Sequence, residues 1–584
     1  MPRAFIGITT PDAAAREGFR EKLRRSHRTR PELRIVLQTD TLLLAAEALG
    51  RVDLPDGKGM VLGRIARGDR RPADGELADN ARMIFYTRGQ ELVERWWGAY
   101  VAFLLPDGGR VEIIRAPLGD LPCYVLREAA GTLISSSPRL LAQFTTTAPQ
   151  IDPAALARYL AFGTIHTRET CLAGIEELPG GDRLTISAGH EDRSTLWSPW
   201  SFAPADRAIL DPEEAANRVR AVTQACVAAC AKLDGAMLLK LSGGLDSSIV
   251  AACLSRSSVA ASALTLVTDD ASGDERIHAQ AIADHLRMRL AHARRDPEAF
   301  DPARSPAAGL PRPCIPGFRQ VSDRLAAAAA AATGATAVLD GGGGDNVFCS
   351  LQSAAPVADC LLTRSGRPML MRTATSLAAI ANVSTLAVLR GAAARAFGKP
   401  RNHRWPVDLK MLSAEAAAEI PLRPDHPWLV APRGTLPGRA AHVALIAAGQ
   451  SYVEALDPGQ EPALIAPLLA QPLVELCLRI PSWLWFEQGL NRFAARRAFG
   501  SELPQSIVQR RSKGSPDCFV AQILERNWTV VRESLLGGAL AERNLLDRAA
   551  LGAILGRGRP PTDGELHRIM RLFDAEVWAR SWVP

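Results

Sequence analysis

The chain has 584 residues, a formal net charge of +7 and a mean hydropathy near zero, which together indicate a globular protein with two or three domains. No apolar run is long enough to span a bilayer and the N-terminus has no signal-peptide core, so we expect a cytoplasmic protein without a membrane partner. Among its ten cysteines there is no Cys-x-x-Cys pair. The sequence also lacks the combination of basic and aromatic residues that would indicate a nucleic-acid partner.

The first part of the chain, residues 1–205, shows the alternating, turn-punctuated pattern of antiparallel strands. Residues 100–105 and 110–115 flank a Pro-Asp-Gly-Gly sequence, which predicts a β-hairpin. Further strands are predicted at residues 118–124, 133–137 and 183–186. We therefore expect a β-rich domain that ends near residue 205.

Residues 206–584 alternate helical patterns with short apolar strands, which is typical of a parallel sheet covered by helices. The proline-rich stretch 300–320 is predicted to be a loop. Residues 365–425 carry the weakest pattern, and we interpret them as a candidate for a mobile lid. Arg and Lys cluster over residues 364–410, which indicates either a solvated face or a cradle for ATP or an acidic substrate. The expected strands are residues 236–241, 262–267 and 336–339.

The sequence Ser-Gly-Gly-Leu-Asp-Ser-Ser at residues 242–248 joins the predicted strand 236–241 to a predicted helix over residues 249–254. A strand, a glycine turn and a helix N-terminus form an anion-binding device, because the first helical N–H groups have no partner within the helix. Gly243 and Gly244 let the backbone approach a ligand, and the serine hydroxyl groups add donors. The run lacks the Gly-Lys-Ser/Thr ending of a Walker A loop, so another type of phosphate site is indicated.

A second glycine-rich loop, Leu-Asp-Gly-Gly-Gly-Gly-Asp-Asn-Val-Phe, occupies residues 339–348 at the end of a predicted strand. Its four consecutive glycines permit another close backbone approach to a ligand. Asp345 supplies a hard oxygen ligand, and Mg²⁺ is bound in proteins by carboxylates together with phosphate oxygens. The pair of loops therefore predicts a nucleotide site with Mg²⁺.

The two loops together resemble those of the synthetase domain shared by class B asparagine synthetases, β-lactam synthetases and lasso-peptide macrolactam cyclases. These enzymes are ATP pyrophosphatases, which cut ATP between its α- and β-phosphates and form an acyl-adenylate. The resemblance implies ATP and Mg²⁺ as cofactors, with Asp246 and Asp345 as the metal ligands. It also implies a nucleotide-binding set that comprises Leu241, Ser242, Gly243, Gly244, Asp246, Ser247, Ser248, Val267, Asp340 and Gly341.

A basic segment near the C-terminus, residues 504–514, resembles the part of the family that brings a catalytic lysine over the α-phosphate. A fixed cation at that place stabilises the charge that grows in the transition state. We predict Lys513 as this catalytic residue and Arg510 as a second one, and a shifted register assigns the role of the lysine to Arg511. The segment follows a predicted helix that contains Asn491, Arg492, Arg496 and Arg497.

Residues 95–200 resemble the closing half of a class-II glutamine amidotransferase domain, a sandwich of two antiparallel sheets between helices. A working glutaminase of this type needs Cys directly after the initiator Met, but this sequence has Pro2 there, and its first cysteine is Cys123. We therefore expect a degenerate domain that does not hydrolyse glutamine. The expected fold class is α/β, with a degenerate Ntn-like αββα domain over residues 1–205 and an ATP-pyrophosphatase synthetase domain with a parallel sheet over residues 206–584.

Gly342 stands three residues before Asp345, where asparagine synthetases and β-lactam synthetases have a Glu or a Tyr that acts on the nucleophile. Together with Pro2, this departure favours the lasso-peptide cyclases. Such an enzyme adenylates the side-chain carboxylate of an Asp or Glu in a precursor peptide, and the N-terminal amine of that peptide then closes a macrolactam. The implied partners are the precursor core peptide, a leader peptidase and a leader-recognition protein, and the general base is not assigned.

Two alternatives stay open at this point. The first is an asparagine synthetase or β-lactam synthetase-like enzyme that uses ammonia or a small amine. The second is a non-catalytic scaffold that keeps nucleotide binding, and a measurement of ATP–pyrophosphate exchange separates it from the enzymes. A neighbouring gene for a short precursor peptide would favour the cyclase.

Overall fold

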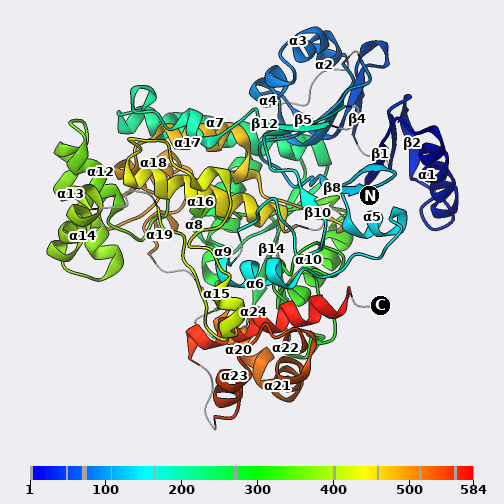
Figure 1. Cartoon of the computed structure of the whole chain (residues 1–584). Helices are drawn as coiled ribbons and strands as arrows, with labels where there is room; N and C mark the ends of the chain where they lie inside the picture. The colour runs from blue at the N-terminus through cyan, green and yellow to red at the C-terminus, as the bar shows by residue number, and fades with distance from the viewer. Residues whose placement is uncertain are drawn as a thin grey trace.

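The computed structural model describes residues 4–47, 50–68, 75–106, 108–163, 165–187, 190–268, 270, 273–398, 403–456, 459–511, 514–557 and 562–582. Two antiparallel sheets and one parallel sheet organise these residues. Figure 1 shows the antiparallel strands in blue and cyan on one side of the molecule, with the last helices in orange and red beneath the centre.

The expected lack of glutaminase activity depends on Pro2, and the expected catalytic cation is Lys513. Both residues lie outside the described residues. Cys123, the first cysteine, is described and is fully buried. Burial raises the pKa of its thiol to about 12, so Cys123 is a packing residue and not a nucleophile.

The N-terminal region is a sandwich of two six-stranded antiparallel sheets. The predicted hairpin is confirmed, because β6 pairs with β7, and the predicted sandwich is confirmed as well. The first sheet contains, in spatial order, β10 (Ile175–Glu177), β8 (Tyr124–Glu128), β9 (Gly131–Ser135), β1 (Phe5–Thr9), β3 (Leu42–Ala46) and β2 (Arg34–Gln38). The second contains β12 (His190–Thr195), β11 (Asp182–Ser187), β7 (Val111–Arg115), β6 (Trp97–Leu104), β5 (Gly59–Ala66) and β4 (Arg51–Asp53).

Successive side chains of β6 pack on opposite faces of its sheet, as the period of a strand requires. Val101 and Phe103 belong to the core between the two sheets, where the Phe103 ring meets Phe5 edge-on at 5.6 Å. Tyr100 and Ala102 belong to the core on the helical side. The first sheet packs against α1 (Ala13–Ser26), α5 (Pro138–Phe144) and α6 (Pro153–Phe162), and the second against α2 (Glu76–Asp79), α3 (Ala81–Tyr86) and α4 (Gln90–Arg95).

The strand predicted at residues 118–124 is wrong except for its last residue, because β8 begins at Tyr124. Pro122 has no N–H group to donate to a neighbouring strand, so the segment cannot continue a ladder. The apolar pattern has another cause. Leu118 and Leu121 are buried as part of an irregular segment that packs onto the sandwich.

The second half of the chain is built on a five-stranded parallel sheet, which confirms the predicted fold class. The chain starts in the centre at β13, moves outward through β14 to β15 and then returns to β16 on the other side. In open parallel sheets such a reversal leaves a ligand-binding crevice at the carboxyl ends of the two central strands. The spatial order is β15 (Leu290–Arg294), β14 (Ala261–Val267), β13 (Met237–Lys240), β16 (Ala337–Leu339) and β17 (Ala463–Ile465).

Helices cover both faces of the parallel sheet. Leu238 of β13 shares a cluster with Ala330 of α10 (Arg319–Thr333), whereas Leu239 shares the opposite core with Ile249 of α8 (Leu245–Ser255). Because β13 is buried on both faces, it reads as a continuous apolar run in the sequence. The predicted loop 300–320 is confirmed up to the start of α10 at Arg319.

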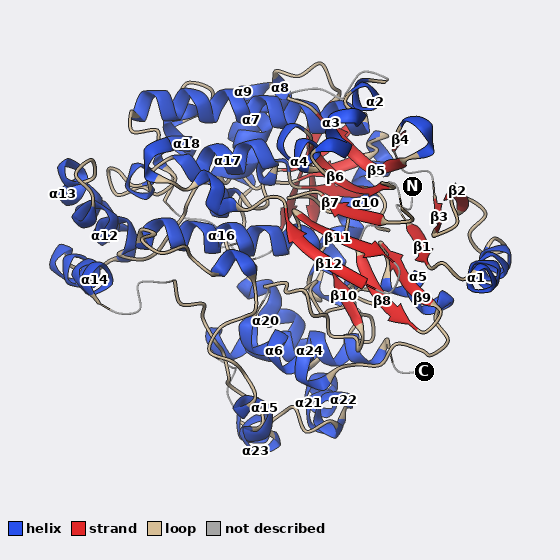
Figure 2. Cartoon of the chain, turned by 45° about the horizontal axis from the view of Figure 1, so that its top comes forward, coloured by secondary structure: helices blue, strands red, loops and turns tan. Residues whose placement is uncertain are grey.

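The segment 365–425, which carries the weakest pattern in the sequence, contains three α-helices among its described residues. The α13–α14 hairpin, defined as residues 367–397, packs on α12 and projects from the edge of the molecule in both Figure 1 and Figure 2. Its helical period is hard to see in the sequence because apolar side chains also occupy its solvent-exposed side. The helices of this region are α12 (Ala355–Leu362), α13 (Leu370–Ala381), α14 (Thr385–Phe397) and α15 (Ala414–Ala418).

The helix predicted to contain Asn491 and Arg492 begins only at Phe493. Arg492 adopts a left-handed conformation with a φ of +54°, which cannot be part of a right-handed helix. The remaining helices are α7 (Pro212–Asp234), α9 (Arg276–Leu286), α11 (Gly344–Val347), α16 (Pro437–Glu454), α17 (Gln471–Arg479), α18 (Phe493–Ala498), α19 (Gln505–Val508), α20 (Asp517–Arg526), α21 (Trp528–Gly537), α22 (Ala539–Glu542), α23 (Arg548–Leu555) and α24 (Asp563–Arg580).

Within the described residues, no single helix has both the length and the apolar character needed to cross a membrane. The segments Arg367–Ala381 and Thr385–Phe397 meet the length and composition criteria only as a pair, which is bent by 113°.

A buried ionic cluster joins the sandwich to α16. Arg115 of β7 contacts Glu177 at 2.9 Å and Glu454 of α16 at 3.0 Å, and Arg312 contacts Glu177 at 2.5 Å. His166 lies 3.5 Å from Glu454, so these acids and the imidazole are close enough to share a metal ion. Because two guanidinium groups already use the carboxylate oxygens, we interpret the cluster as an ionic contact between the two parts of the chain.

Asp359 of α12 is expected to make the stability of the protein depend on pH. It is completely buried, and its carboxylate accepts hydrogen bonds from Gly438 N and Ser482 Oγ, both at 2.7 Å. Burial raises its pKa to about 7 in spite of these bonds. The folded pKa therefore exceeds the unfolded value of about 3.9, so the stabilising contribution of the protonated acid is complete below pH ~4 and is lost as the pH rises through ~7.

We therefore expect Asp359→Asn to raise the melting temperature relative to the wild type at pH 8 by more than it does at pH 5. The amide oxygen can still accept the bond from Gly438, and the substitution removes the buried charge. Thermal melts of both proteins at the two pH values measure the difference. Equal shifts at pH 5 and pH 8 would contradict the assignment of this titration to Asp359.

Candidate functional site

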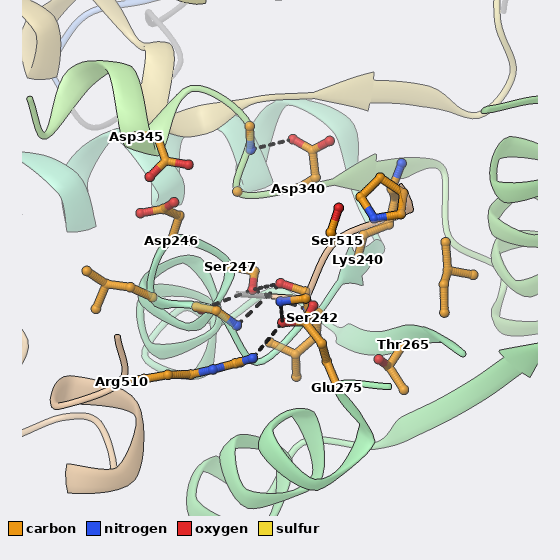
Figure 3. Close-up of a pocket in the computed structure, with 18 of the residues that line it drawn as sticks. Lys240, Ser242, Asp246, Ser247, Thr265, Glu275, Asp340, Asp345, Arg510 and Ser515 are labelled. Atoms are coloured by element: carbon orange, nitrogen blue, oxygen red, sulfur yellow. Dashed lines mark hydrogen bonds and ion pairs between the residues drawn. The ribbon is translucent and has the colours of Figure 1, made fainter. Parts of the chain in front are cut away.

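The first glycine-rich loop begins at the carboxyl end of β13 and leads directly into α8. Gly244 is the residue before the first helical turn, so the N–H groups at the start of α8 lie at the crevice. Ser242 Oγ lies 3.2 Å from Ser247 Oγ and accepts a hydrogen bond from Gly244 N at 3.3 Å, which stabilises the turn (Figure 3). The hydroxyl of Ser248 instead donates to the Gly244 carbonyl at 2.8 Å, within the helix.

The second loop packs closely against the first, and its glycines make this contact possible. A Cβ atom on Gly341 would lie 2.6 Å from Ser247 N, and one on Gly344 would lie 2.4 Å from Asp246 Cγ. Gly243 has a φ of +68°, and a Cβ there would lie 2.6 Å from a backbone nitrogen of α9. Larger residues would force these segments apart, so the glycines bring the two loops together as well as opening them to a ligand.

The two predicted metal ligands lie next to each other at the mouth of the crevice, as Figure 3 shows for Asp246 and Asp345. Arg492 Nη1 lies 2.8 Å from Asp246 Oδ2 and 2.7 Å from Asp345 Oδ1, so a single nitrogen contacts both carboxylates. Burial lowers the pKa of Arg492, but the two carboxylates raise it overall, so the guanidinium stays charged. The two carboxylates therefore point at one place beside the cavity, and a pair of carboxylates is the kind of donor set that Mg²⁺ prefers.

A cavity of about 380 Å³ lies between the two loops and the basic C-terminal segment. This size is within the usual range for small-molecule sites. Six basic residues and four acids line it, an excess of positive charge that suits a polyphosphate. The basic residues are Lys240, Arg295, Arg492, Arg496, Arg510 and Arg511, and the acids are Asp246, Glu275, Asp340 and Asp345. An apolar wall that suits a nucleobase is formed by Leu241, Leu264, Leu266 and Phe318.

Most residues of the predicted nucleotide-binding set line this cavity, namely Leu241, Ser242, Gly244, Asp246, Ser247, Asp340 and Gly341. Three do not. Gly243 packs against α9, and Ser248 bonds within α8. Val267 is the last residue of β14 and is 8% exposed, and the preceding residues Thr265 and Leu266 reach the cavity instead.

Arg510, predicted as catalytic, holds the basic C-terminal segment against the first loop. Its Nη1 donates to the Gly243 carbonyl at 3.0 Å, and its Nη2 donates to Glu275 Oε1 at 2.8 Å. The same Glu275 oxygen accepts a hydrogen bond from Gly514 N at 3.1 Å. Glu275 therefore fixes two points of the C-terminal segment beside the cavity, and Arg510 has a positioning contact in addition to its place in the wall.

The sequence did not assign Lys240, Arg295 or Arg496 to the site. Lys240 is the charged end of an otherwise apolar strand, which is a usable signal. Burial lowers the pKa of Lys240, and the charge of Asp340 opposes that shift. Arg496 donates to the carbonyls of Asn491 and Arg510, so it joins the two segments that carry the site's basic residues.

Tyr452 of α16 fills the space next to Gly342. Asparagine synthetases and β-lactam synthetases have a Glu or a Tyr at the position of Gly342. A Cβ on Gly342 would lie 2.3 Å from Tyr452 Cε1 and 2.7 Å from Asp340 Oδ1. Tyr452 Oη donates to Asp340 Oδ2 at 2.7 Å, and Gly342 N donates to Asp340 Oδ1 at 2.8 Å. The wall of the cavity at this point is therefore the Asp340 carboxylate, held from behind by Tyr452.

We expect Gly342→Glu to lower both stability and activity, although it introduces a residue found in the family. Overpacking a filled site typically costs about 1–3 kcal/mol, because Tyr452 and Asp340 would have to move. The melting temperature and the rate of AMP formation measure the two effects. The double variant Gly342→Glu, Tyr452→Ala serves as the control, since it vacates the space and should recover part of the lost stability. A fully stable and active Gly342→Glu variant would contradict this packing argument.

Comparisons with known proteins define the class. The asparagine synthase family matches residues 218–429 and 462–580, and a glutamine amidotransferase domain matches residues 81–197. The first match covers more than half of the chain and includes both glycine-rich loops, so the protein belongs to the asparagine synthase family.

The chain is also similar to a curated protein, the carboxyethyl-arginine β-lactam synthase of Streptomyces clavuligerus, with 30% identity over 190 residues. This match covers 32% of the chain and 34% of the relative, so it spans about a third of that protein's length. A solved structure described as the allosteric regulatory enzyme of purine biosynthesis is 6% identical, with 50% of this chain and 74% of that chain covered. Its TM-score of 0.20 is too low to indicate a shared fold.

Proposed function

We propose that the protein is an ATP-dependent carbon–nitrogen ligase that activates a carboxylate as its acyl-adenylate and transfers the acyl group to an amine. The observation that carries this proposal is the meeting of the two glycine-rich loops at the reversal of the parallel sheet, where Asp246 and Asp345 share one cationic atom. Membership of the asparagine synthase family supports it. The expected products are AMP, pyrophosphate and an amide.

In such a reaction, different residues of the site have different roles. The N–H groups at the start of α8 and the hydroxyls of Ser242 and Ser247 bind the pyrophosphate. Asp246 and Asp345 hold Mg²⁺, which neutralises charge on the leaving pyrophosphate when it is bound. Lys513 is assigned to the charge that grows at the α-phosphate. Holding the amine beside the acyl-adenylate contributes on the order of 7–11 kcal/mol to lowering the barrier.

The finer proposal is that the carboxylate and the amine belong to one peptide, as in lasso-peptide macrolactam cyclases. Gly342 supports it, because the Glu or Tyr with which the asparagine and β-lactam synthetases act on a small nucleophile has no counterpart at that position. The space is closed by Tyr452, which holds Asp340. The partners in this proposal are the precursor core peptide, a leader peptidase and a leader-recognition protein.

A second candidate is a β-lactam synthetase-like enzyme that acts on a small amino acid. The 30% identity to the Streptomyces clavuligerus enzyme favours it. Asparagine synthesis is less well supported, because Gly342 stands where asparagine synthetases have a Glu or a Tyr. A non-catalytic nucleotide-binding scaffold is also less well supported, because both carboxylates of the proposed metal site are present.

Product analysis with ATP and Mg²⁺ tests these proposals in one experiment. The substrates are aspartate with ammonium chloride, N2-(carboxyethyl)arginine, and the leader-free core peptide of a precursor encoded beside the gene. We expect AMP and a peptide product lighter by one water, seen by mass spectrometry, from the peptide alone. A product from either small substrate would overturn the peptide assignment, and the absence of both AMP formation and ATP–pyrophosphate exchange with all three would overturn the ligase.

A further inference from the structure

The positive charge of the protein is concentrated in one segment. Residues 360–407, which contain the α13–α14 hairpin, have eight Lys and Arg residues and no Asp or Glu. The rest of the chain has 61 Lys and Arg against 62 Asp and Glu, so it is close to neutral. Such a distribution indicates a directed electrostatic surface rather than a uniformly basic composition. The basic residues are Arg364, Arg367, Arg372, Arg390, Arg395, Lys399, Arg401 and Arg404.

The hairpin exposes apolar side chains among these cations. The exposed fractions are 53% for Met371, 48% for Val383, 55% for Leu386 and 69% for Phe397. On α14, Leu386, Arg390 and Phe397 are four and seven residues apart, so they lie along one face of the helix. Exposed apolar side chains grouped with cations mark an interaction surface. Within the described part of the chain, the exposed arginines without an ion pair in this region include Arg364, Arg367, Arg390 and Arg395.

The hairpin is also connected to the catalytic cavity through the turn at residues 487–492. Arg372 of α13 pairs with Glu487, and Gly489 N donates to Ser376 Oγ at 3.4 Å. The same turn ends at Arg492, which contacts both Asp246 and Asp345. A ligand that lies on α13 is therefore next to the segment that carries a cavity residue.

We infer that the exposed faces of the α13–α14 hairpin bind an acidic segment of the peptide substrate that also carries apolar side chains. This inference rests on the proposed peptide-ligating function. Arginine suits such a ligand, because its planar fork pairs with carboxylates in two parallel hydrogen bonds. An anionic membrane offers similar chemistry, but the connection to the cavity favours a ligand that reaches the site of adenylation.

A direct binding measurement tests the surface without knowledge of the natural substrate. The probe is a short fluorescein-labelled peptide of alternating glutamate and leucine, and a lysine–leucine peptide of equal length is the comparison. We expect fluorescence anisotropy at low salt to show binding of the acidic peptide alone. The double variant Arg390→Glu, Arg395→Glu is expected to weaken this binding at least about tenfold, as the loss of two charge-assisted contacts implies.

The matched control reverses the same number of charges elsewhere, with Arg28→Glu and Arg34→Glu, which are exposed on the N-terminal region. It should change the affinity less than twofold. A second hairpin variant, Leu386→Ser with Phe397→Ser, should also weaken binding, because it removes the apolar contacts and leaves the charge unchanged. Thermal melts confirm that each variant is folded.

Three results would overturn the inference. They are no binding of the acidic peptide to the wild type, equal loss in the hairpin and control variants, and binding of phosphatidylglycerol vesicles in place of the peptide, which would make the hairpin a membrane surface. Binding of a fluorescent ATP analogue is measured in parallel on the same proteins. If the wild type did not bind the nucleotide, the proposed ligase would be contradicted. The hairpin variants should bind the nucleotide as tightly as the wild type.

Discussion

Asp246→Asn and Asp345→Asn are each expected to reduce AMP formation by a factor on the order of 10³ while the protein stays folded. The two carboxylates contact the same guanidinium nitrogen of Arg492, so they point at one place, and they are the pair proposed to hold Mg²⁺. An amide has the shape of the carboxylate but no charge, so each variant keeps the packing and loses half of the metal site. Chromatography of AMP from ATP, with the substrate that supports turnover, gives the rate, and thermal melts give the stability.

The matched control for this pair is Asp274→Asn. Asp274 lies near the same cavity, but its carboxylate pairs with the exposed Arg276 and does not line the cavity. It should keep AMP formation within about twofold of the wild type, since exposed ion pairs contribute little. Near-normal AMP formation in either Asp246→Asn or Asp345→Asn would remove that residue from the metal site.

Lys513→Ala is expected to slow product formation by about 10²–10³ with little loss of ATP affinity, because one fixed cation is removed from the transition state. Arg510→Ala should behave differently. Arg510 holds the Gly243 carbonyl and Glu275, so its loss should loosen the first loop and weaken ATP binding itself. Nucleotide affinity from a fluorescent ATP analogue and the rate at saturating ATP separate the two effects.

Arg511→Ala completes this comparison, because Arg511 is the alternative register for the catalytic cation and is exposed at the edge of the cavity. It should leave both the rate and the affinity nearly unchanged. A normal rate in Lys513→Ala with a slow Arg511→Ala would shift the register by two residues and keep the mechanism. Normal rates in both would require another source of charge at the α-phosphate.

Much of the fold could be predicted from local patterns in the sequence. The hairpin of β6 and β7 could be predicted because alternating apolar residues flank a turn sequence, and α8 because a glycine turn separates it from a buried strand. The strand prediction for residues 118–124 was wrong except at Tyr124, because a buried irregular stretch produces the same apolar pattern as a strand. The α13–α14 hairpin could not be predicted from the sequence, because its exposed side also carries apolar residues that conceal the helical period.

The sequence by itself determined the two glycine-rich loops, the carboxylates of Asp246 and Asp345 and the alternation of helices and strands that predicts a parallel sheet, because each depends on residues that are neighbours in the chain. Only the tertiary structure decided which atoms face them. Arg492 reaches both carboxylates from a turn 246 residues after Asp246, and Tyr452 occupies the space beside Gly342 from a helix 110 residues further on. Such contacts depend on how distant segments pack and on a left-handed backbone at Arg492, and neither leaves a periodic signal in the sequence.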